Sequence, residues 1–124
     1  MIIRPASTKD CQAIYSLYQN EKWLSFTEEK VTSLFSTNLS HYLVLEEDQK
    51  ILGFASYLTD EVMTTFLAEI IIDKAYRGKG LGQQLIEEIH KKYPLTRIEL
   101  ISEVDGFYQT VGFKPVGTGF RKSE

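Results

Sequence analysis

The segment Arg77-Gly78-Lys79-Gly80-Leu81-Gly82 has the residue types needed to bind a phosphate group. It follows an apolar run that ends in Ile70-Ile71-Ile72, which predicts a strand. It precedes apolar residues at helical spacing, which predict an amphipathic helix. Glycines let the backbone approach a ligand closely, and the first amides of a helix have no partner within it. Because those amides lie at the positive end of the helix dipole, the sequence predicts a cradle for a phosphate or pyrophosphate.

Two common nucleotide-binding patterns do not fit this segment. The P-loop needs Gly-Lys-Ser/Thr four residues after a first glycine, and the sequence lacks it. The dinucleotide pattern needs a third glycine where Gln83 stands, and too little chain follows for its remaining βαβ units. The simpler alternative is a tight strand-to-helix turn that uses glycine only for its backbone geometry.

Two motifs in order resemble those of the GNAT superfamily of N-acetyltransferases. The stretch from Ile70 to Leu85, with Arg-x-x-Gly-x-Gly at its centre, is similar to the acyl-CoA signature of that family. Downstream, the sequence Phe107-Tyr108-Gln109-Thr110-Val111-Gly112-Phe113 resembles its FYxxxGF element. The resemblance extends over almost the whole chain and implies acetyl-CoA as co-substrate, with no metal.

The resemblance also implies which residues bind the coenzyme. Three residues at the end of the predicted strand match the segment that pairs with the pantetheine arm like an added strand, namely Ile70, Ile71 and Ile72. The glycine loop and the start of its helix match the pyrophosphate cradle, namely Arg77, Gly78, Lys79, Gly80, Leu81, Gly82 and Gln83. An ordinary core strand is the alternative for the first group.

Acyl transfer to an amine needs a base for the amine and an acid for the departing thiolate. Tyr108 matches the family tyrosine near the thioester sulfur, and a phenol with a pKa of about 10 can donate that proton. Its alternative role is to pack on the sheet. Glu69 matches a carboxylate that some members use as the base. Strand alternation or a bulge decides which way it faces, so a surface glutamate, Glu61, Glu103 or a backbone carbonyl with water stay open as alternatives.

Length and composition predict one ordinary globular domain over residues 1–124, with 43% hydrophobic and 25% charged residues. A net charge of −3 disfavours sequence-independent nucleic-acid binding. No apolar run approaches the ~20 residues that span a bilayer, so we expect no membrane association. The N-terminus lacks a signal-peptide pattern and there is a single cysteine, so we expect a cytoplasmic protein.

The predicted elements make an α+β fold, with a mixed, mostly antiparallel central sheet flanked by helices, which is also the order of the GNAT-like acyl-CoA N-acyltransferase fold. Gly53 predicts a bulge or a close backbone approach. The predicted helices are one after a capping box at 7–10, one capped by Ser25 or Thr27, one from the glycine loop to Pro94, and 105–111. The predicted strands are 2–5, 42–46, 51–59, 63–72, 97–102 and 113–116.

Three features depart from the family pattern or leave its specificity open. Lys74 replaces a proline that often follows the strand, and an asparagine before the family tyrosine is absent. Little chain remains for the last strand, so it is either stunted or its edge is covered by a second subunit, which makes a homodimer possible. Trp23 and Phe26 lie in the loop that sets acceptor choice in the family, and either wall a pocket or anchor a helix.

The sequence therefore predicts an acetyl-CoA-dependent N-acetyltransferase that acetylates a primary amine by direct transfer in a ternary complex. The acceptor is a small molecule or a peptide. The alternatives are a non-catalytic CoA-binding sensor or interaction module on the same fold, and a phosphate-ligand binder unrelated to CoA.

Overall fold

A five-stranded sheet in the order β1-β2-β3-β4-β5 forms the centre of the protein in this computed structural model, which describes residues 1–37 and 41–123. Neighbouring strands run antiparallel except β4 and β5, which are parallel. The predicted mixed, mostly antiparallel sheet is therefore confirmed. The strands are β1 (Ile2–Pro5), β2 (His41–Glu47), β3 (Lys50–Thr59), β4 (Thr64–Ile72) and β5 (Arg97–Glu99).

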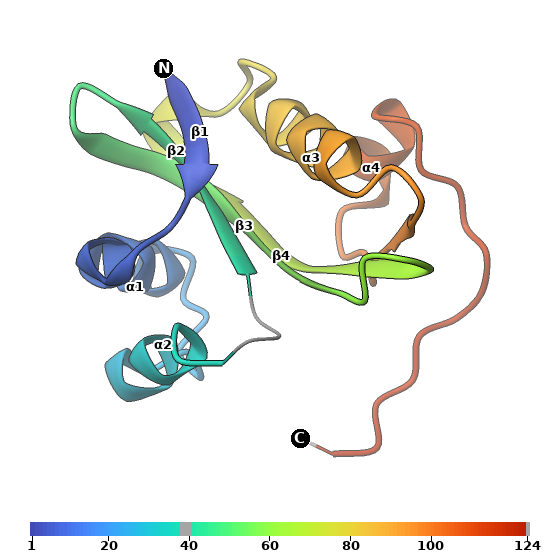
Figure 1. Ribbon diagram of the computed structural model, residues 1–124, viewed down its shortest axis with the longest axis horizontal. Helices are drawn as coiled ribbons and strands as arrows, with labels where there is room; N and C mark the ends of the chain where they lie inside the picture. Colours follow the sequence, from blue (N-terminus) through green and yellow to red (C-terminus); the bar gives the residue numbers. More distant parts are fainter. Residues whose placement is uncertain (38–40, 124) are drawn as a thin grey trace.

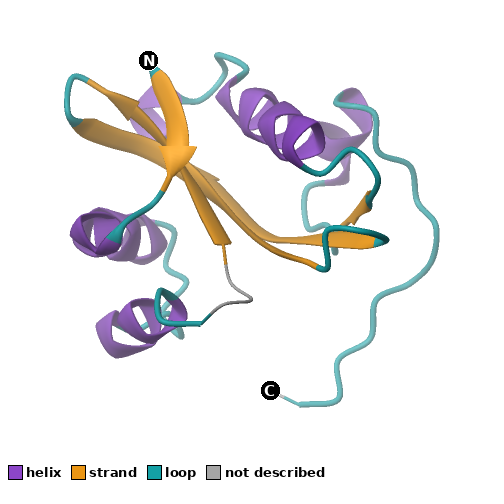
Figure 2. Ribbon diagram, viewed as in Figure 1, coloured by secondary structure: helices purple, strands orange, loops and turns teal. Residues whose placement is uncertain are grey.

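Helices cover both faces of this sheet (Figures 1 and 2). The first pair, α1 (Cys11–Asn20) and α2 (Glu28–Leu34), lies on one face, and α3 (Leu81–Lys92) and α4 (Asp105–Thr110) lie on the other. Two short 3-10 turns, η1 (Thr8–Asp10) and η2 (Lys74–Tyr76), precede α1 and the glycine loop. No helix in the described ranges is both long and apolar enough to cross a membrane.

Each face of the sheet has its own hydrophobic core. On the α1 face, Ile14, Tyr18 and Val31 are fully buried against Phe54 of β3 and Ile71 of β4. On the α3 face, the helix contributes the side chains that the helical spacing predicted, namely Leu81, Leu85, Ile86 and Ile89. The long apolar strands β3 and β4 are therefore covered on both sides, which explains their nearly continuous hydrophobic sequence.

An ionic cluster connects the first strand to the first helix. The Arg4 guanidinium donates to both carboxylate oxygens of Asp10, at 2.8 and 3.0 Å, and to Glu46 at 2.7 Å. Asp10 also accepts from the Ser7 backbone N–H at 2.8 Å, as the predicted capping box requires. Arg4 holds the pKa of the nearly buried Asp10 below its ordinary value.

Two bulges set which side chains face which helices. Leu52 is an extra residue in β3, and Ala68 is an extra residue in β4. Gly53, next to the first bulge, lies so close to β4 that an added Cβ would be 2.7 Å from the Ile71 carbonyl oxygen, which confirms the predicted close approach. Because of the second bulge, Leu67 and Ile70 lie on the same face although they are three residues apart.

The C-terminal part of the sheet is shorter than predicted. The strand predicted at 97–102 ends at Glu99, and the strand predicted at 113–116 is wrong, since residues 113–123 form no strand. They run past the sheet as an irregular segment (Figure 1). Pro115 lacks a ladder donor, and the following glycines at 117 and 119 weaken strand formation. Gly119 passes beside Ile101, where an added Cβ would lie 3.0 Å from the side chain, so the segment packs there without joining the ladder.

Candidate functional site

The glycine loop opens α3 with a backbone that other residues adopt with difficulty. Gly78 and Gly80 have positive φ angles of 79° and 76°, in the left-handed region where a Cβ is strained. Gly80 is the N-cap of α3, and its carbonyl accepts from Gln84 at 3.2 Å. In the described part of the chain, no acceptor takes the N–H groups of residues 81–83. These groups are free to bind an anion at the positive end of the helix.

The two cations of the loop are used differently. The Arg77 side chain turns back toward the sheet, where its Nε donates to the Ile72 carbonyl at 2.9 Å and its guanidinium pairs with Glu21 at the end of α1. Lys79 stays exposed, with its Nζ 5.4 Å from the centre of the Tyr76 ring. Lys50, at the start of β3, lies 5.2 Å from the same ring. Lys50 is therefore a second lysine beside Tyr76. Sequence reasoning missed it, because no local pattern links the start of β3 to the glycine loop.

Gly82 connects the two sequence motifs. An alanine Cβ at this position would be 3.0 Å from Cζ of Phe107 and 3.7 Å from the Ile70 side chain. The absence of a side chain thus lets α4 pack closely against the start of α3, and the residue after Phe107 is Tyr108. The third glycine of the loop serves helix packing, whereas Gly78 and Gly80 serve the turn.

Strand β4 loses one neighbour after the first three of its nine residues. β5 pairs with it only from Thr64 to Phe66. The Asp73 N–H bonds the Leu52 carbonyl of β3 at 2.8 Å, and backbone groups alternate in direction along a strand, so the groups of Ile70 and Ile72 face the opened edge. By this alternation the Ile70 N–H points away from β3, and in the described part of the chain no residue outside the strands accepts from it. Of the three predicted strand residues, Ile71 instead turns its backbone groups toward β3.

Tyr108 lies half-buried on α4. Its ring packs edge-on against Phe107 at 5.0 Å and Phe113 at 5.7 Å between ring centres. Burial raises the pKa of the phenol, so Tyr108 keeps its proton at neutral pH. Within the described residues its hydroxyl has no hydrogen-bond partner in the protein, which leaves it available to a ligand.

Glu69 lies on the opposite face of the sheet from Tyr108, toward α1. One carboxylate oxygen accepts from the Tyr18 hydroxyl at 2.8 Å, and the Tyr18 and Tyr42 hydroxyls are 2.9 Å apart. Burial raises the pKa of Glu69, while hydrogen bonds from Tyr18 and Ser56 oppose the rise. The alternative of a surface glutamate is therefore wrong. Sequence reasoning missed both tyrosines as partners of this carboxylate.

The other carboxylates considered for the base, Glu61 and Glu103, are both exposed. Glu61 lies in the turn after β3 with a positive φ of 66°. The two aromatic residues of the α1–α2 loop pack against the core: Phe26 stacks on Tyr18 with ring centres 4.0 Å apart, and Trp23 lies 6.2 Å from the same ring. This geometry shows the anchoring role for both.

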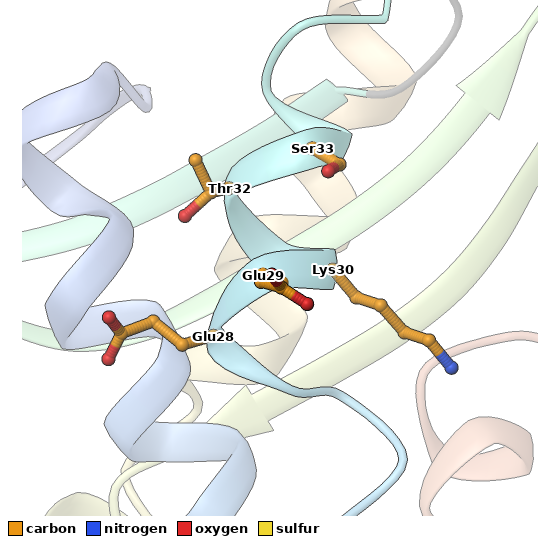
Figure 3. Close-up of a pocket in the computed structure, with 5 residues that line it drawn as sticks. All are labelled: Glu28, Glu29, Lys30, Thr32 and Ser33. Atoms are coloured by element: carbon orange, nitrogen blue, oxygen red, sulfur yellow. The ribbon is translucent and has the colours of Figure 1, made fainter.

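Two hollows lie on the α1 side of the molecule. A cavity of about 270 Å³ separates the end of α1 from the end of β4. Its lining residues are Leu17, Asn20, Glu21, Ile71, Ile72, Asp73 and Lys74. A wider hollow of about 600 Å³ lies along α2 (Figure 3), but its lining comes entirely from the exposed side of that one helix. We therefore place the candidate site at the first cavity and the opened edge of β4.

Comparison with known proteins finds sequences that are similar to most of this chain. A family model described as an acetyltransferase (GNAT) domain matches residues 38–115. A curated protein of Glycine max named histone acetyltransferase TAP1 is 29% identical over 96 residues, which cover 73% of this chain and 42% of that protein. GCN5-related N-acetyltransferase 2, chloroplastic, of Arabidopsis thaliana is 27% identical over 81 residues, covering 61% and 31%. The chain thus spans less than half the length of these relatives.

Solved structures share the fold. The ribosomal-protein-alanine N-acetyltransferase of Brucella melitensis biovar Abortus 2308 has a TM-score of 0.82 at 14% identity, with all of both chains covered. An aminoglycoside N-acetyltransferase solved in complex with CoA has a TM-score of 0.79 at 14% identity, covering 99% of this chain and 93% of that one. These similarities show the fold, and the chemistry depends on the site residues.

Proposed function

This chain belongs to the GNAT acetyltransferase family, and we propose that it transfers the acetyl group of acetyl-CoA directly to the primary amine of an acceptor. The observation that carries this proposal is the position of the free α3 amides near the opened edge of β4. An anion site and an unpaired strand edge are what a ligand with a diphosphate and an amide-bearing arm requires.

The residues fit such a co-substrate. Gly78 and Gly80 have no atom within 4 Å of an added Cβ, so the surface of the loop is open for a diphosphate. The N–H groups of residues 81–83 and the Lys79 ammonium would hold it. The Ile70 carbonyl and the Ile72 N–H face the opened edge and would offer an acceptor and a donor to the arm, whereas the Ile72 carbonyl already accepts from Arg77. When bound, acetyl-CoA supplies the activated thioester.

Three protein groups would then perform the chemistry. The Ile70 N–H at the opened edge can donate to an oxygen that becomes negative during transfer. Tyr108, whose raised pKa keeps it protonated, can give its proton to the departing thiolate. Glu69 can take the proton of the incoming ammonium, whose pKa is about 10.4 in water, directly or through a water molecule.

The environment of Glu69 predicts how activity falls on the acid side of the pH profile, the acid limb. Burial raises the pKa of this carboxylate, so its basic form is lost at a higher pH than for an exposed glutamate. Activity should therefore decline as the pH falls through the raised pKa. Glu69→Gln should remove this limb and lower kcat by about 10²–10⁴-fold.

The test is a thiol-release assay with acetyl-CoA and a panel of amines. Because relatives are named for histone, aminoglycoside and ribosomal-protein acetylation, the panel should contain a lysine peptide, an aminoglycoside and a peptide with an N-terminal alanine. Tyr108→Phe should lower kcat by about 10²-fold or more while the Kd for CoA, measured by calorimetry, is unchanged. CoA binding without turnover of any amine would favour a sensor, and absence of CoA binding would refute the proposal.

A further inference from the structure

The Glu69 carboxylate is the end of a buried chain of hydroxyl groups. Tyr18 donates to its Oε1 at 2.8 Å, and each phenol has only one proton. The Tyr18 oxygen must therefore accept the 2.9 Å hydrogen bond from Tyr42. The order Tyr42 to Tyr18 to Glu69 is fixed by this arithmetic, and the three residues come from β2, α1 and β4.

Packing holds the Tyr18 ring in place. Tyr18 is fully buried, stacks on Phe26 with an angle of 3° between ring planes, and lies 5.0 Å from Phe54. A ring enclosed in this way has little rotamer freedom, so the position of its hydroxyl is set before any ligand binds. The Oε1 atom of Glu69 is held by this hydroxyl, and Ser56 of β3 is the second hydroxyl that hydrogen-bonds to the carboxylate.

We propose that Tyr18 is a positioning residue for acetyl transfer, whose hydrogen bond keeps the Glu69 carboxylate in the ionised form that proton removal from the acceptor requires. This inference rests on the proposed function and on Glu69 as the base. Tyr18 acts through Glu69 and need not touch the substrate itself.

The electrostatics of the cluster give the direction of the effect. The titratable groups that face Glu69 are Tyr18 of α1, Tyr42 of β2 and, beside Tyr42, the Cys11 thiol of α1; Ser56 of β3 adds a neutral hydroxyl. Burial raises the pKa of both phenols, so they remain protonated donors through the working pH range. The Tyr18 hydrogen bond lowers the pKa of Glu69 against the effect of burial. Loss of the Tyr18 hydroxyl should therefore raise the pKa of Glu69.

The experiment compares wild type with Tyr18→Phe, which keeps the ring and its packing. We expect the pKa of Glu69, followed by ¹³C NMR of labelled glutamate and assigned with Glu69→Gln, to rise by about one unit. On the acid limb kcat/KM should fall about tenfold, and the two profiles should converge at high pH. In a Glu69→Gln background, Tyr18→Phe should have no further effect on kcat/KM.

Tyr57→Phe is the matched control. It removes a buried tyrosine hydroxyl that pairs at 3.4 Å with Tyr93 in the core on the α3 face, away from Glu69. It should leave the Glu69 pKa and the acid limb unchanged. A uniform loss at all pH values in Tyr18→Phe, or equal behaviour of the two phenylalanine variants, would overturn the inference. Absence of acetyl transfer by the wild type would instead refute the proposed function, and the NMR titration would still report on the Tyr18 bond.

Discussion

Gly82→Ala tests the packing that connects the glycine loop to α4, the helix that carries Tyr108. An added Cβ would lie 3.0 Å from Cζ of Phe107, whereas ordinary contacts begin at 3.4 Å, so Phe107 must move by a few tenths of an ångström. Overpacking costs about 1–3 kcal/mol, with the lower end expected here because Phe107 is 37% exposed and can yield. The better helix propensity of alanine offsets up to about 1 kcal/mol.

Gly106→Ala separates these two contributions. Gly106 is the second residue of α4, as Gly82 is of α3, and an added Cβ there meets no atom within 4 Å. This control should show only the stabilisation from the better helix propensity of alanine. In urea unfolding, the free energy of unfolding of Gly82→Ala should therefore be lower than that of Gly106→Ala by at least about 1 kcal/mol. Because the clash moves the helix of Tyr108, kcat should also fall roughly threefold to tenfold in Gly82→Ala only.

A double variant identifies the cause. Phe107→Leu removes the ring atoms that the new methyl group meets, so it should rescue Gly82→Ala with a coupling free energy of about 1 kcal/mol. If Gly82→Ala and Gly106→Ala were equally stable, or if the two substitutions at Gly82 and Phe107 were additive, the argument from packing would be refuted.

Two further predictions follow from charged groups. Asp10→Asn should lower the free energy of unfolding by about 1.5–3 kcal/mol at neutral pH, because Asp10 is nearly buried and bonded to Arg4. Since Arg4 lowers the pKa of Asp10 from 3.8, this stabilisation is lost as the pH falls through the lowered value, and unfolding curves of wild type and variant should converge there. Lys79→Ala should weaken CoA binding up to about fivefold in calorimetry, less at high salt. Lys92→Ala, at the far end of α3, should leave the affinity for CoA unchanged.

The parts of the fold that the sequence predicted depend on local geometry. Gly78 and Gly80 were expected in a turn before a helix, and both have the positive φ angles that such a turn uses. Apolar residues repeat along α3 with the helical period, and Pro94 follows its end, so the helix could be delimited within a few residues. The sequence also predicted strands at 42–46 and 51–59, and the short turn that joins β2 to β3 has positive φ angles at Asp48 and Gln49.

The parts that could not be predicted depend on contacts between distant segments. Tyr18 and Glu69 are 51 positions apart, and Arg77 and Glu21 are 56 apart. No periodicity within α1 indicates that its tyrosine will meet a carboxylate of β4. The direction of Arg77, away from the loop and toward the Ile72 carbonyl, also depends on where α1 packs.

Strand β4 divides the proposed chemistry between its two faces and its edge. The bulge at Ala68 places Leu67, Ile70 and Ile72 on the face of α3 and leaves Glu69 on the face of α1. Between the two faces, the early end of β5 leaves backbone groups of β4 unpaired. The proposed acid on α4 and the proposed base on β4 would therefore reach the leaving thiolate and the incoming amine from opposite faces of the sheet, across this opened edge. The early end of β5, which the sequence predicted to continue to residue 102, thus opens the edge of β4 at which we propose that the ligand binds.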